Sequence, residues 1–117
     1  MSASNIPLLT GATLLVDSSV AAVVIVKASS AVLYELELDN TANAAVTYLR
    51  LYNATTATIG STQYDSLVLV PASVKITLVL PAGVTFGTGL CYAATTSATL
   101  ATTTAPGSAF TIKLVYV

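Results

Sequence analysis

The apolar and polar residues of the chain alternate in the way that short β-strands require. In residues 34–39, tyrosine and leucine alternate with acidic residues, so that the apolar side chains share one face of an extended strand. Residues 47–51 alternate in the same manner, and residues 20–26 are a continuous run of valine, alanine and isoleucine, which favours a buried strand. No stretch of a dozen residues repeats with the period of a helix. The pattern predicts an all-β protein.

Turn-forming residues divide the chain into eight predicted strands. We expect these strands at residues 12–16, 20–28, 32–39, 45–52, 64–70, 74–80, 89–95 and 109–117. Gly, Pro and Asn fall between them, for example at residues 40–43 and 81–83. This spacing predicts a single jelly-roll or Greek-key β-sandwich of about eight short antiparallel strands. The sandwich domain covers residues 12–117, and residues 1–11 are either an N-terminal arm or its first strand.

The two alternating segments are candidates for a β-hairpin. If they pair in the register that joins Leu36 to Leu49, both apolar faces align and Glu35 meets Arg50. A jelly roll can instead place the two strands in opposite sheets. Both arrangements remain open at the level of the sequence.

One strand carries an acidic cluster made of Glu35, Glu37 and Asp39. Alternate residues of a strand lie about 6.5 to 7 Å apart, which is wide for sharing a single Ca²⁺ ion without further oxygen ligands. We interpret the cluster as the solvent face of a strand that Arg50 partly balances. Metal binding and acid–base catalysis are the alternatives.

Composition and charge exclude several classes of function. The chain has four Lys or Arg, five Asp or Glu and no His, with a net charge of −1. We therefore expect no nucleic-acid partner, since four cations cannot neutralise a run of phosphates. Without histidine, Cys91 lacks an activating base and is expected to be a buried structural thiol. We predict neither enzymatic activity nor a metal or cofactor, and the seven-residue apolar run before Lys27 is too short to span a membrane.

The chain has more apolar residues than one sandwich core can bury. Apart from its alanines it contains 45 apolar residues, whereas the core of such a sandwich holds about 24 to 28 side chains. Large exposed apolar patches usually mark interfaces. We therefore expect the chain to work in an assembly, through self-association with a trimer favoured or through contacts with neighbouring subunits. The candidate contact residues are Ile6, Leu8, Leu9, Tyr52, Tyr64 and Tyr116.

A net charge near zero also predicts how the chain attaches to a partner. Electrostatic steering is weak for such a chain, so attachment should depend on apolar and backbone contacts. The uncharged residues 1–11 are the candidate arm for this role, because such a segment can order on a partner surface or add a strand to a sheet. The alternative is that residues 6–9 form the first strand of the sandwich itself.

Three segments of the chain resemble small all-β virion proteins of tailed bacteriophages. They are YLRLYNATTATIGST at 48–62, LPAGVTFGTGL at 80–90 and YAATTSATLATTTAPGSAFTIKLVYV at 92–117. The resemblance implies a jelly-roll or similar sandwich with no enzymatic activity. It also implies a place in the virion, which is assembled in the host cytoplasm.

Within a virion, the resemblance favours a head decoration (cement) protein that contacts the major capsid protein. A tail, fibre or baseplate module is the next alternative. A third possibility comes from the six tyrosines, which could form a carbohydrate-binding surface if two or three rings were exposed and coplanar.

Overall fold

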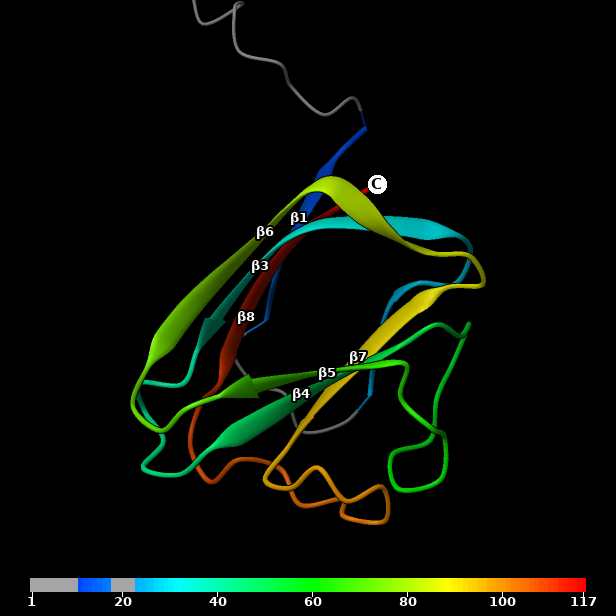
Figure 1. Cartoon of the computed structure of the whole chain (residues 1–117). Coiled ribbons are helices and arrows are strands. Elements are labelled where there is room, and N and C mark those ends of the chain that lie inside the picture. Colours follow the sequence, from blue (N-terminus) through cyan, green and yellow to red (C-terminus); the bar gives the residue numbers. More distant parts are fainter. Residues whose placement is uncertain (1–10, 18–22) are drawn as a thin grey trace, which may run out of the picture.

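The computed structural model describes residues 11–17 and 23–117, which form two packed antiparallel sheets (Figure 1). The eight strands are β1 (Thr13–Asp17), β2 (Val24–Lys27), β3 (Ala31–Asp39), β4 (Thr47–Tyr52), β5 (Ser66–Val70), β6 (Lys75–Phe86), β7 (Leu90–Thr95) and β8 (Thr111–Tyr116). The described part of the chain has no helix that could cross a membrane. The prediction of an all-β sandwich of eight strands is confirmed.

The strand order is that of a jelly roll. β1-β8-β3-β6 form what we name the first sheet, and β2-β7-β4-β5 form the second sheet. The antiparallel pairs β4·β5, β3·β6, β2·β7 and β1·β8 therefore fall alternately in the second and the first sheet. The chain is in effect one long hairpin, closed between β4 and β5, whose paired arms are rolled over each other.

The predicted hairpin between the alternating segments 34–39 and 47–51 is wrong, and the alternative that places them in opposite sheets is correct. β3 lies between β8 and β6, whereas β4 lies between β7 and β5. The apolar faces of the two strands still meet, because Leu36 of β3 and Leu49 of β4 belong to the same core. They meet across the two layers rather than within a sheet, so alternation alone could not distinguish the two arrangements.

The core lies between the sheets and is built from the inward-facing alternate residues of both. Its buried residues are Ala31, Leu33, Leu36, Leu38, Leu49, Leu51, Val70, Phe86, Leu90, Tyr92, Ala94, Phe110, Ile112 and Leu114. The hydroxyl of Tyr92 donates a hydrogen bond of 2.8 Å to Asp17, which ties the second sheet to β1. Burial, followed by the contact with Asp17, raises the pKa of Tyr92 far above its ordinary value.

Two buried asparagines hold the chain where it crosses from the first sheet to the second. The side-chain amide of Asn40 donates to the carbonyls of Ala45, Val70 and Pro71. The amide of Asn43 donates to Ala109, and its side-chain oxygen accepts from the backbone of Ser108. Buried polar groups are costly unless they are bonded in this way. These bonds explain why the turn signal at residues 40–43 makes a crossing rather than a tight hairpin.

Residues 81–83 do not break the chain as the sequence predicts, because β6 continues through them to Phe86. The pairing with β3 shifts between Leu33 and Glu35, and β6 accommodates the extra residues as a bulge. Pro81 is tolerated because β6 is an edge strand. Gly83 has a φ of 73°, and a side chain there would collide with Val32 and Tyr34. The turn residues therefore bend a strand instead of ending it.

Candidate functional site

The two outer faces of the sandwich differ sharply. Loops 53–65 and 96–109 lie beneath the second sheet in Figure 1 and cover the outward side chains of β4 and β7, whereas those of the edge strand β5 stay exposed. A small second core forms there, in which Tyr52, Cys91 and Ala93 are buried against Ala54 and Ile59, among others. The first sheet has no such cover among the described residues. Its outer face is consequently the candidate functional surface.

Arg50 holds the cover of the second sheet in place. Its side chain is 0% exposed, and its guanidinium donates to the carbonyls of Ser97 (3.1 Å), Thr99 (2.6 Å) and Leu100 (3.2 Å). The ring of Tyr64 lies 5.5 Å from the guanidinium carbon. The prediction that Arg50 lies on a solvent face opposite Glu35 is wrong, because these loops fold over it. A planar five-donor group suits a loop whose carbonyls converge.

The tyrosines named as interface candidates have different surroundings. Tyr52 is fully buried, so the structure places it in the core rather than on a contact surface. Tyr64 is half-buried, and its hydroxyl donates to the carbonyl of Ala98. Tyr116 is half-buried at the end of β8 and packs against the main core. The other candidates, Ile6, Leu8 and Leu9, lie outside the described residues, as does all of the proposed N-terminal arm except Gly11.

Cys91 is buried under the first of the two covering loops, as the sequence predicts. Its thiol lies 3.2 Å from the carbonyl oxygen of Ala54 and donates to it. Burial raises the pKa of the Cys91 thiol. A thiol held in its neutral form under a loop is a structural group rather than a nucleophile.

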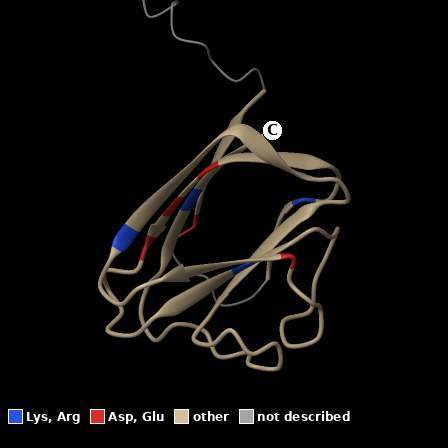
Figure 2. Cartoon of the chain, viewed as in Figure 1, with Lys and Arg blue, Asp and Glu red and all other residues tan. Residues whose placement is uncertain are grey.

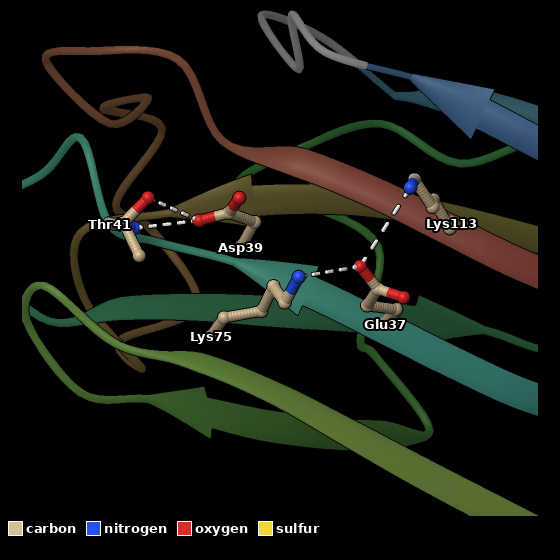
Figure 3. Close-up of polar contacts among 5 residues, drawn as sticks. All are labelled: Glu37, Asp39, Thr41, Lys75 and Lys113. Carbon is tan, nitrogen blue, oxygen red and sulfur yellow. Dashed lines mark hydrogen bonds and ion pairs between the residues drawn. The ribbon is translucent and has the colours of Figure 1, made fainter.

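The strands of the first sheet carry most of the charged residues of the chain (Figure 2). The register of the sheet aligns Asp39 with Lys75 of β6, and Glu37 with Lys113 of β8. Figure 3 shows both lysines turned toward Glu37, whose carboxylate lies 3.3 Å from the Lys75 ammonium and 3.9 Å from that of Lys113. The lysines of neighbouring strands, and not Arg50, balance the acidic cluster.

Asp39 is stabilised separately, at the end of β3. Its carboxylate accepts hydrogen bonds from the hydroxyl and the backbone amide of Thr41 (Figure 3), the latter at 3.0 Å. These bonds, with smaller contributions from Lys75 and Lys113, hold the pKa of Asp39 below its ordinary value. The carboxylates are thus spread along the strand with separate partners. Within the described residues, no group of acidic side chains is arranged to hold a metal ion.

Exposed apolar side chains accompany these charges on the same face. Leu14 on β1 is 61% exposed and Val79 on β6 is 64% exposed. Sheet register aligns Leu14 with Val115 and Val79 with Glu35, so the four form one row across the sheet. A shallow depression of about 280 Å³ lies along this row. It is lined by Leu14, Glu35, Glu37, Lys113 and Val115.

Sequence reasoning did not single out these apolar residues, nor the second exposed group on β5. There Leu67 and Leu69 point away from the core while their neighbour Val68 packs against it. The available signal was the strand pattern itself, because these leucines alternate with inward-facing valines. The strand pattern does not show which outward side chains the loops cover. No family model, curated protein or solved structure matches this chain.

Proposed function

We propose that the protein is a non-enzymatic structural subunit that associates with itself and attaches to a larger assembly. The observation that carries this proposal is the bare outer face of the first sheet, where strongly exposed Leu14 and Val79 flank partly buried carboxylates. A row of apolar side chains bordered by charges is typical of an interaction surface.

The contrast with the second sheet supports this assignment. There two loops and a buried arginine cover the outward side chains of β4 and β7. On the first sheet it leaves Leu14, Val16 and Val79 in solvent. The carboxylate of Glu35, which lies beside them, makes no hydrogen bond or ion pair within the described residues. A partner that supplies apolar contacts and a donor for Glu35 would complete the face.

The resemblance to tailed-phage virion proteins specifies the assembly. On that basis we propose a head decoration protein that contacts the major capsid protein in the virion, with a tail, fibre or baseplate module as the alternative location. The jelly-roll fold agrees with this role, but a fold hosts many functions, so the surface and the resemblance carry the proposal. A carbohydrate site is not proposed, because Tyr52 is buried and Tyr64 is engaged by Arg50.

The first test asks whether the chain is a virion component. Mass spectrometry of purified phage particles from the source of this sequence should find the chain in fixed ratio to the major capsid protein. Particles that lack it would overturn the virion assignment. A fixed ratio to a tail protein instead would move the subunit to the alternative location.

The second test addresses the surface. The double variant Leu14→Glu with Val79→Glu should lose binding to undecorated heads in a co-sedimentation assay, while its thermal unfolding stays close to that of the wild type. Ile25→Glu with Val74→Glu is the matched control, because it places the same charges on two exposed apolar residues that lie outside both the Leu14–Val79 row and β5. Equal binding by wild type and the Leu14/Val79 variant would exclude the first sheet as the attachment face.

A further inference from the structure

β5 is an edge strand with free backbone hydrogen-bonding groups. Within the described residues it pairs with β4 alone. The carbonyl of Leu51 accepts from the amide of Asp65, which shows that Leu51 directs its backbone toward β5. Because backbone direction alternates along an antiparallel pair, Ser66, Val68 and Val70 face β4. The amides and carbonyls of Leu67 and Leu69 therefore point to the free edge.

The other three edges of the sandwich carry features that oppose strand pairing. β6 begins with Lys75 and is bent by the bulge around Pro81. β2 has four residues and an irregularity between Ile25 and Lys27. β1 ends in Asp17, whose carboxylate is turned inward to Tyr92. Charges, prolines, bulges and inward-pointing acids are the devices that protect sheet edges.

β5 has none of these devices. Its residues Ser66–Val70 include no charge and no proline, and its pairing with β4 is regular throughout. Leu67 and Leu69 are 36% and 51% exposed on the outer face. An uncharged, regular edge with exposed leucines is suited to accept one more extended strand.

We propose that this strand is β5 of a second copy, paired antiparallel about Val68, so that the two second sheets form one eight-stranded sheet. The inference rests on the self-association in the proposed function and specifies its surface. In this register Leu67 of each copy lies opposite Leu69 of the other. Both residues direct their backbone groups to the edge, so the four groups on each copy form hydrogen bonds.

The ends of the strand agree with this register. Asp65 of one copy comes opposite Pro71 of the other, so the two Asp65 carboxylates lie about 20 Å apart and do not repel strongly. Pro71 has no amide to donate, and pairing therefore stops there on both sides. The contact has two-fold symmetry and produces dimers, whereas a trimer would need two different surfaces in contact.

Charge substitutions at the edge test the register. In Leu67→Lys with Leu69→Lys, every cross-strand pair joins two lysines, and the dimer dissociation constant should rise by about 10- to 100-fold. In Leu67→Glu with Leu69→Lys, every cross-strand pair joins opposite charges, and dimerisation should recover. Leu14→Lys with Val79→Lys, on the first sheet, is the control that should leave dimerisation unchanged. Light scattering at high micromolar concentration measures the mass, and thermal unfolding checks that each variant folds.

The outcomes separate this inference from the proposed function. A wild type whose mass stays at the 11.9 kDa of one chain overturns the β5 contact. An oligomer whose mass is the same in the Lys/Lys variant also overturns it, but leaves self-association in place through another surface. Failure of the Glu/Lys variant to recover, while it remains folded, overturns the antiparallel register. Loss of head binding in the Leu14/Val79 variant concerns only the proposed attachment face.

Discussion

The central strands of the second sheet are covered by loops of the chain, whereas no loop among the described residues covers the outer face of the first sheet. Both sheets have four strands, and both contribute one face to the same core. On the second sheet, the outward side chains of β4 and β7 are almost all buried under loops 53–65 and 96–109. On the first sheet, the outward residues of the central strands β3 and β8 are half-buried or exposed, and those of the edge strands β1 and β6 are mostly exposed. Similar strands are thus buried or exposed on their outer side according to the loops.

This difference depends on how irregular loops can be held against a sheet. Loop backbones carry carbonyls that must be bonded wherever they are removed from water. Arg50 meets this need for Ser97, Thr99 and Leu100. The short side chains of the alanine- and threonine-rich segment let its backbone approach the sheet closely. A single buried guanidinium therefore satisfies the loop carbonyls and holds loop 96–109 against the second sheet.

Removing Arg50 should have the largest effect on the covered face. Arg50→Ala deletes three charge-assisted hydrogen bonds and the contact with Tyr64, and should lower the free energy of unfolding by about 3 to 5 kcal/mol. Urea titration followed by circular dichroism measures the loss. Arg50→Lys keeps a cation but loses the planar fork, so its free energy of unfolding should lie between those of the wild type and Arg50→Ala. A wild-type stability for Arg50→Ala would show that other contacts hold loop 96–109.

Gly89 tests the other covering loop. A β-carbon at Gly89 would lie 2.5 Å from the carbonyl oxygen of Ala54 and 3.0 Å from that of Lys27, both backbone atoms. Gly89→Ala should therefore displace loop 53–65, lower the free energy of unfolding by about 2 kcal/mol, and speed the reaction of Cys91 with a thiol reagent. Gly87→Ala is the control, since a side chain there meets open space. Unchanged labelling of Cys91 in Gly89→Ala would contradict this account of the loop.

The sequence predicted the strands well because a strand is a local pattern. Each of the eight predicted strands overlaps an observed one, but β6 runs to Phe86 instead of ending at residue 80. The jelly-roll alternative followed from the number and spacing of the strands. Strand pairing was harder to predict from the sequence, because Leu36 and Leu49 align equally well within one sheet or across two. Pro81 and Gly83 predicted a turn, but β6 is an edge strand and continues through both residues with a bulge.

The candidate site was harder to foresee than the fold. Arg50 alternates with leucines like any solvent-facing residue, and only the path of loop 96–109 reveals that it is buried. Tyr52, a predicted contact residue, is likewise fully buried. Leu14 and Val79 look like core residues in the sequence. Which outer face is covered is a tertiary property that no strand pattern contains.

Substitution by threonine should have different effects on the two faces. Val79→Thr on the bare face replaces a methyl group that is already in solvent, and should change the free energy of unfolding by less than about 0.5 kcal/mol. Ala93→Thr on the covered face adds atoms to a fully buried position, and should cost about 1 to 3 kcal/mol. Thermal or urea unfolding of both variants makes the comparison. Equal losses would mean that the two faces are equally packed.

The smallest expected effect concerns Asp39 on the bare face, and it disappears in acid. Because Thr41 lowers the folded-state pKa of Asp39, this carboxylate contributes stability above its unfolded-state pKa and loses it as the pH falls through the folded-state pKa. Thr41→Val removes the hydroxyl donor but keeps the backbone amide. The variant should therefore be slightly less stable than the wild type at neutral pH, and the two should converge as the solution is acidified below the pKa of Asp39. Carboxyl NMR titration measures that pKa directly. An ordinary Asp39 pKa in the wild type, or a difference from Thr41→Val that persists in strong acid, would show that Thr41 acts through packing instead.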